Sequence, residues 1–232
     1  MILDEKIIEL AVASVAFVGT HMVMSALPVR TPLVARFGVW PFRAIYSAVS
    51  FVCFTWMVIA FMQAPHVEVF ETKTGLKHLS YSAMAIACFL LVCGYTQPNP
   101  TAVGMEKVGL RAGARGVLKI TRHPVMWGVA IWSACHLLAS GHMAALVFFG
   151  AITFLAIAGS IHIDKNKKNL GDPSWDDYME ATSNVPMLAI IKGKTRVERG
   201  EYKWWQILLS AALYFGLLIS HESIIGVYVM PF

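Results

Sequence analysis

The chain has 232 residues, of which 57% are hydrophobic and only 14% are charged, and its formal net charge is +5. A water-soluble domain carries about 25% charged residues, so this composition excludes an ordinary soluble globular protein. Charges are absent from long runs such as 45–62 and 79–95. Because an apolar helix of about 20 residues spans a bilayer, the sequence predicts an integral membrane protein.

Six apolar runs predict six membrane-spanning helices. In chain order we expect them at 7–27, 41–63, 78–96, 124–141, 143–163 and 205–230. The first run follows Asp4, Glu5 and Lys6, and it is too long for a cleaved secretory signal, so we expect it to be retained. The predicted fold class is all-α, a polytopic integral membrane helix bundle of about six transmembrane helices that forms a single domain over residues 1–232.

The basic residues are sorted to one side of these helices. Of the 19 lysines and arginines, only Lys6, Lys73 and Lys77 lie outside three regions that share a side when there are six spans. These regions are 28–43, 97–123 and 164–204. Loops rich in Lys and Arg face the cytoplasm, so the positive charge reflects topology in the bilayer and implies no nucleic-acid partner. In the cytoplasmic segment before the last helix, Trp175 and Tyr178 indicate a short helix at the headgroup level.

Polar side chains within the predicted spans are candidates for function, because they are costly in hydrocarbon and normally face the bundle interior. Three histidines lie deep in these helices: His21, His136 and His221. A neutral imidazole is a ligand for iron, and helix bundles hold haem between facing helices. Two interpretations are open, which are haem ligation and hydrogen bonding between helices.

Depth restricts which histidines can share one iron. His123 and His136 are 13 residues apart on one helix, so they differ in height by roughly 20 Å and cannot do so. His136 lies toward the non-cytoplasmic end of its helix, whereas His21 lies toward the cytoplasmic end of its own, a gap that helix tilt would close. His78 is closer in depth to His136 when the helices are untilted. It is therefore the competing partner.

The residues Thr121, Arg122, His123 and Pro124 open the fourth predicted helix. Proline is tolerated in a first turn, and Thr121 or His123 is a candidate cap. Arg122 is either a cation at a helix start or a contact for an anion there, such as a lipid phosphate or a haem propionate. Near the C-terminus, Glu222 is an intramembrane carboxylate whose role stays open between a buried pair and a proton relay.

The segment Gly113–Gly128 resembles the signature of the NnrU family. Blocks elsewhere in the chain resemble the same family: Gly19-Thr20-His21, Tyr46–Ser50, Trp132, His136–Gly141, Phe148–Gly150, Trp175, Tyr178 and Thr182–Pro186. The resemblance covers nearly the whole chain. It implies a bacterial inner-membrane protein associated with denitrification, that is with nitrite and nitric oxide reduction, and a membrane respiratory reductase as a partner.

A plastid relative of the family, 15-cis-zeta-carotene isomerase, is an integral membrane haem b enzyme whose ligand pattern carries over by motif. The resemblance implies that His21 and His136 are the axial ligands of haem b, and that Trp132 contacts the cofactor. In a haem protein of this type we also expect Arg122 and His123 to contact either the cofactor or a lipid headgroup at the cytoplasmic edge.

This chain also departs from its relatives. The isomerase has a redox-linked cysteine three positions before its second histidine, where this chain has Ser133, with Cys135 displaced, so a thiolate ligand switch is not assumed. The Arg-His-Pro block resembles isoprenylcysteine carboxyl methyltransferases too, but their paired glutamates are missing and Asp164 is the nearest acid. Methyl transfer from S-adenosylmethionine is thus the weaker enzymatic alternative. A further alternative is an accessory or assembly factor with structural histidines, and whether the chain is an enzyme stays open.

Overall fold

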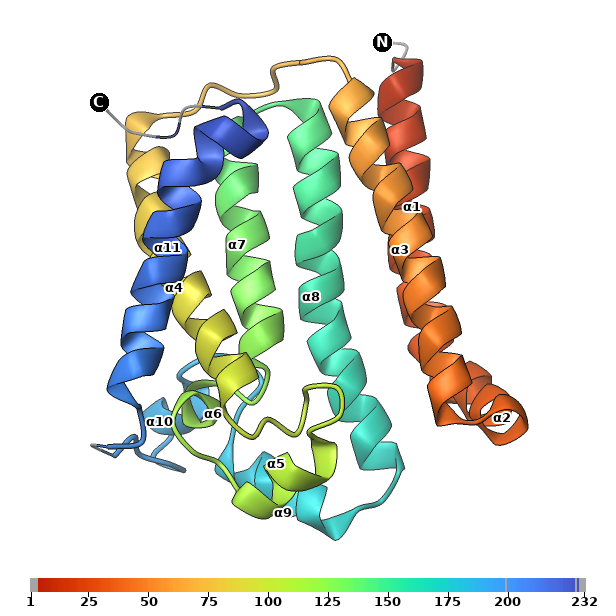
Figure 1. Ribbon diagram of the computed structural model, residues 1–232, viewed down its shortest axis with the longest axis vertical. Coiled ribbons are helices and arrows are strands. Elements are labelled where there is room, and N and C mark those ends of the chain that lie inside the picture. The colour runs from red at the N-terminus through yellow and green to blue at the C-terminus, as the bar shows by residue number, and fades with distance from the viewer. Residues whose placement is uncertain (1–3, 199, 228, 230–232) are drawn as a thin grey trace.

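The computed structural model describes residues 4–198, 200–227 and 229 as a bundle of long helices with short helices gathered at one end (Figure 1). Within this described part there is no β-strand, only an isolated bridge between Glu68 and His142. The predicted all-α class is therefore confirmed.

The six predicted long helices are all present. They are α1 (Glu5–Ser25), α3 (Val39–Gln63), α4 (Thr74–Thr96), α7 (Pro124–Ser140), α8 (Met143–Asn169) and α11 (Trp204–Ile225). Among the described residues, five of these are long and apolar enough to cross a membrane, and α7 is a shorter apolar helix. α11 ends before the predicted residue 230, because Gly226 adopts the left-handed conformation that closes a helix, and residues 228 and 230 lie outside the described part.

In the part of the chain that the structure describes, five short helices connect the long ones. They are α2 (Leu27–Phe37), α5 (Glu106–Ala112), α6 (Val117–Ile120), α9 (Pro173–Ala181) and α10 (Leu188–Ile191). The short helix expected around Trp175 and Tyr178 is confirmed as α9. The sequence predicts a loop between the first two long helices, but a helix forms there instead. Ala26 is extended, and Pro28 lies in the first turn of the new helix, a position that tolerates proline. This break also ends α1 earlier than predicted.

α8 separates two groups of packed helices, α4, α7 and α11 on one side and α1 and α3 on the other. α7 packs between α4 and α8, α11 packs on α4, and α1 packs on both α3 and α8. Gly128 lets α7 approach α4 closely, because a Cβ there would lie 2.8 Å from Cγ of Leu91. The buried core around α1, α3 and α8 includes Leu10, Met57 and Phe149.

The outer surface of the long helices is apolar. Val15, Phe51 and Ile219 are 72%, 71% and 72% exposed, and they lie on three different helices. A soluble monomer rarely exposes apolar surface on this scale, so these faces are suited to lipid. The charged loops and short helices gather instead at the end of the bundle where α1 and α8 finish (Figure 1).

Candidate functional site

His136 is held in a fixed orientation on α7. Its Nδ1 lies 2.8 Å from the backbone oxygen of Trp132, one turn earlier, and the half-buried ring stacks on Phe149 of α8 at 4.9 Å between centroids. A carbonyl oxygen only accepts, so Nδ1 carries the proton. Nε2 of the neutral ring is then free to bind a metal, as in histidines whose other nitrogen is oriented by a backbone carbonyl.

His21 has the same local geometry on α1. Its Nδ1 lies 3.0 Å from the backbone oxygen of Phe17, again one turn earlier, which leaves Nε2 unprotonated. The half-buried ring packs against Phe17 at 4.4 Å and against Tyr46 of α3 at 5.3 Å. Each of the two predicted ligands therefore presents an unprotonated Nε2.

The structure does not bring His21 and His136 together. His136 stacks on Phe149 near the start of α8, whereas Ser25, one turn after His21, accepts a hydrogen bond from Asn166 near the end of α8. At 1.5 Å of rise per residue the two histidines differ in depth by roughly 15–20 Å, and α8 packs between their helices. One iron cannot touch both in this arrangement.

Another histidine lies closer to His136. The ring of His221 on α11 is 6.2 Å from that of His136 at an interplanar angle of 24°, and its Nδ1 lies 2.9 Å from the backbone oxygen of Val227. His221 therefore also has an unprotonated Nε2. His78 shares this depth, since Ser80 donates to the backbone oxygen of Cys135. The ring of His78 is exposed, and the contact described for it is with Tyr81.

The five predicted site residues thus fall at two depths. His136 lies with Trp132, whose ring is 4.9 Å away, toward one end of α7. Arg122 and His123 precede α7 at its other end, at the same side of the bundle as His21. No group of three or more His, Cys, Asp or Glu side chains suited to a metal ion occurs among the described residues.

Asp164 on α8 joins the residues at the start of α7. Its two carboxylate oxygens accept from Nε of Arg122 at 3.0 Å, from Nε2 of His123 at 2.7 Å and from Nδ2 of Asn184 at 3.0 Å. The second guanidinium nitrogen of Arg122 also lies 3.0 Å from Asp164, which makes the pair bidentate. Arg122 is only 7% exposed and His123 is fully buried.

The same cluster ties three parts of the chain together. Arg122 donates from its side chain to the backbone oxygen of Thr182 at 3.1 Å, and its backbone N–H donates to Ser183 at 2.9 Å. Thr121 donates its hydroxyl to the backbone oxygen of Asn184. These hydrogen bonds and the ion pair therefore clamp the start of α7 to the end of α8 and to the segment after α9. Thr121 and His123, the two residues predicted as candidate caps, do not cap α7 with their side chains.

His123 keeps one polar atom unused. Burial lowers the pKa of His123 while the hydrogen bond to Asp164 opposes that shift. Nδ1 of His123, the hydroxyl of Tyr178 and Nε1 of Trp175 are buried without a hydrogen-bond partner in the part of the chain that the structure describes. Burial also raises the pKa of the Tyr178 phenol. The guanidinium of Arg122 is bound to Asp164 and to the backbone oxygen of Thr182. The contact of Arg122 and His123 with a cofactor or headgroup stays a prediction.

Sequence reasoning overlooked the central role of Asp164 and Asn184. Asp164 follows directly after a predicted span, on the same side of the membrane as the Arg-His-Pro block. Their position on the same side of the membrane was the signal in the sequence that could have indicated a contact between them. It did not identify the contact, because a sequence does not specify which helix ends are neighbours.

Comparison with known proteins identifies relatives and a family for this chain. The 15-cis-zeta-carotene isomerase of Zea mays is 22% identical over 166 residues, which cover 70% of this chain and 45% of that protein. The isomerase of Arabidopsis thaliana is 26% identical over 126 residues, which cover 53% of this chain and 34% of that protein. The chain therefore spans less than half the length of these relatives, and no solved structure matches it. A family model described as NnrU protein matches residues 9–229, so the chain belongs to the NnrU family.

Proposed function

We propose that this NnrU-family membrane protein binds haem b within the bundle, with His136 as an axial ligand. The observation that supports this proposal is the hydrogen bond from Nδ1 of His136 to Trp132, which leaves Nε2 free between aromatic side chains. A bound haem supplies one-electron redox chemistry. The backbone oxygen of Trp132 and the ring of Phe149 orient the imidazole.

Two residues are candidates for the second ligand. Family resemblance favours His21, whose Nε2 is equally free. Coordination by both His21 and His136 requires the α1–α3 pair to shift relative to α7, since α8 packs between them. Proximity favours His221, whose ring already faces His136. A haem at His136 lies roughly 20 Å in depth from Arg122, so in that case Arg122 and His123 hold the bundle end together.

The test is an absorption spectrum of the detergent-purified protein from haem-replete cells, oxidised and reduced. We expect a haem signal in a 1:1 ratio to protein, lost in His136→Ala. The second ligand is whichever of His21→Ala and His221→Ala converts the ferric spectrum from low spin to high spin. His66→Ala, on an exposed loop, is the control and is expected to leave the spectrum unchanged.

A colourless protein, or a haem spectrum that His136→Ala leaves intact, would contradict the proposal. A colourless protein that copurifies with a nitrite or nitric oxide reductase would instead support an accessory factor for denitrification. We propose the same physiological setting for the haem protein, in a bacterial inner membrane with the basic loops in the cytoplasm.

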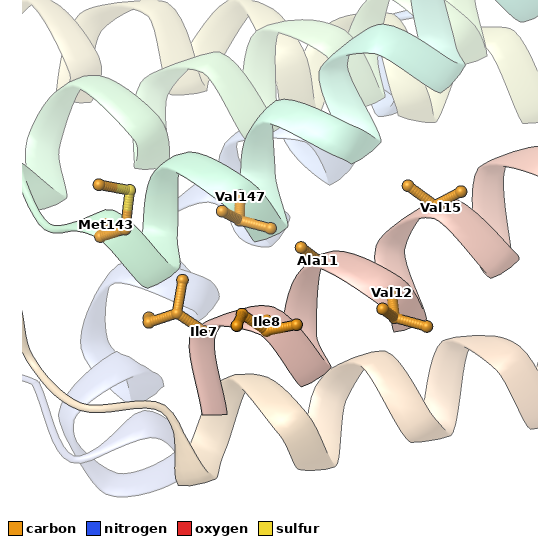
Figure 2. Close-up of a pocket in the computed structure, with 7 residues that line it drawn as sticks. All are labelled: Ile7, Ile8, Ala11, Val12, Val15, Met143 and Val147. Atoms are coloured by element: carbon orange, nitrogen blue, oxygen red, sulfur yellow. The ribbon is translucent and has the colours of Figure 1, made fainter. Parts of the chain in front are cut away.

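A second candidate function is isomerisation of an apolar substrate dissolved in the membrane. The relatives named for carotene isomerisation suggest it, and an apolar groove between α1 and α8 favours it. Figure 2 shows its lining, which is Ile7, Ile8, Ala11, Val12, Val15, Met143 and Val147, around a volume of about 460 Å³. Conversion of 15-cis-zeta-carotene in liposomes by the protein, reduced by Ala11→Phe but not by Ala212→Phe, would support this function. Absence of conversion by the haem-loaded protein would remove it.

A further inference from the structure

A pocket of about 580 Å³ opens at the end of the bundle that carries the basic loops. Its walls come from the end of α4, the segment after α5 and the start of α11. The residues that line it are Thr96, Gln97, Pro98, Ala112, Gly113, Arg115, Leu118, Gly200, Glu201, Lys203 and Gln206. It is separate from the histidines and from the cluster around Asp164, and no function described above uses it.

The pocket contains a buried amide that lacks partners. Gln97 is 8% exposed, and both its Nε2 and its Oε1 are buried without a hydrogen bond among the described residues. The neighbouring Gln206 is satisfied, since it donates to Thr96 and accepts from the backbone of Lys203. A buried polar group normally has a partner, so the amide of Gln97 is suited to a ligand that offers one. Gly116 leaves room for this amide, because a Cβ there would lie 2.7 Å from its Nε2.

The charge that lines the pocket is positive. Arg115 and Lys203 are exposed in it, and neither forms an ion pair with any residue that the structure describes. The carboxylate in the lining, Glu201, is already paired with Lys119 and accepts from the backbone N–H of Gly116. Two cations therefore remain available to an anion.

The pocket also lies at the depth of lipid headgroups. Thr96 is the last residue of α4, and Trp204, which is 73% exposed, is the first residue of α11. Tryptophan at the end of an apolar helix marks the interface between hydrocarbon and water. Arginine and lysine at that level suit a phosphate group.

From this geometry we infer that the pocket binds a phosphate group, held by Arg115, Lys203 and the amide of Gln97. The phosphate belongs either to a phospholipid headgroup or to a free phosphate compound from the aqueous side. The same chemistry recognises both, and the acyl chain of a lipid would follow the apolar surface of α11.

Calorimetry on the detergent-purified protein tests this inference. The probes are dioctanoyl phosphatidylglycerol, dioctanoyl phosphatidylcholine and inorganic phosphate. The pocket variant is Arg115→Gln with Lys203→Gln, and its control is Arg111→Gln with Lys194→Gln, which removes the same charge from exposed positions outside the pocket. We expect the pocket variant to weaken phosphatidylglycerol binding by about 10-fold or more, and the control to change it less than about twofold.

A third variant carries no change of charge. Gln97→Leu is expected to weaken binding by about fivefold, through loss of one hydrogen bond, and it decides the question if the double variant fails to fold. Equal binding of inorganic phosphate and phosphatidylglycerol, with the same sensitivity to the variants, would assign the site to free phosphate. Binding that the pocket and control variants weaken equally, or that Gln97→Leu leaves unchanged, would overturn the inference.

Discussion

Single hydrogen bonds decide what each polar residue in the bundle offers. His21, His136 and His221 each place Nδ1 against a backbone oxygen, at 3.0, 2.8 and 2.9 Å, so each presents an unprotonated Nε2. Arg122 and Asp164 differ from the histidines, because they form an ion pair with each other and hydrogen bonds with neighbouring groups. The histidines therefore each present an unprotonated nitrogen, whereas the charges of Arg122 and Asp164 form an ion pair within the protein.

The first prediction concerns that ion pair. Asp164→Ala leaves the guanidinium of Arg122 buried without its partner, and breaking such a pair costs about 3–5 kcal/mol. We expect a loss of this size in the free energy of unfolding, measured by denaturant titration in detergent micelles. Asp177→Ala, at an exposed position of α9, is the control and should change stability by less than about 0.5 kcal/mol. Equal losses in the two variants would contradict the clamp.

The second prediction concerns pH and Glu201. Although burial acts to raise it, the hydrogen bond from Lys119 holds the pKa of Glu201 below its ordinary value of 4.5. A carboxyl with a lowered pKa contributes stability that is present above the unfolded value and is lost as the pH falls through the folded one. Below pH 4.5 we therefore expect the backbone N–H groups of Gly116 and Glu198, which donate to this carboxylate, to lose protection.

Hydrogen exchange, corrected for the intrinsic dependence of exchange on pH, measures this change. Glu201→Gln should remove the step, because a glutamine amide accepts hydrogen bonds but does not titrate in this range. A step that persists in this variant would assign the transition to another group.

At the scale of elements, close packing of α4 and α7 depends on a glycine. A Cβ at Gly128 would lie 2.8 Å from Cγ of Leu91 and 3.1 Å from the backbone oxygen of Ala87. A Cβ at Gly216 of α11 would meet nothing within 4 Å. Gly128 of α7 and Gly216 of α11 are therefore a matched pair, one at a close helix contact and one in open space.

The third prediction uses this pair. Gly128→Ala should destabilise the protein by about 1–3 kcal/mol, because it forces α4 and α7 apart. Gly216→Ala should be neutral or stabilise it by up to about 1 kcal/mol, through helix propensity. Unfolding by denaturant titration of the two variants measures both values, and a stable Gly128→Ala variant would show that the helices can separate without cost.

At the scale of the whole molecule, orientation in the membrane follows from charge. The fourth prediction is that a cysteine placed at Lys107, in the basic loop before α7, is not labelled by an impermeant maleimide in intact cells. A cysteine at Lys73, before α4, should be labelled. The natural cysteines lie within the long helices, and a cysteine-free background removes their signal. The reverse pattern would invert the proposed topology.

The membrane class, the six long helices and the helix at Trp175 could be predicted from the amino-acid sequence, because hydropathy and helical spacing are local properties of the chain. The sequence also identified the histidines and the Arg-His-Pro block. Which of these residues are in contact became evident from the fold. It set His136 beside His221 and apart from His21, and it joined Arg122 and His123 to Asp164 and Asn184. Those contacts depend on which helices are neighbours and at what depth, and the packing of the whole bundle fixes both.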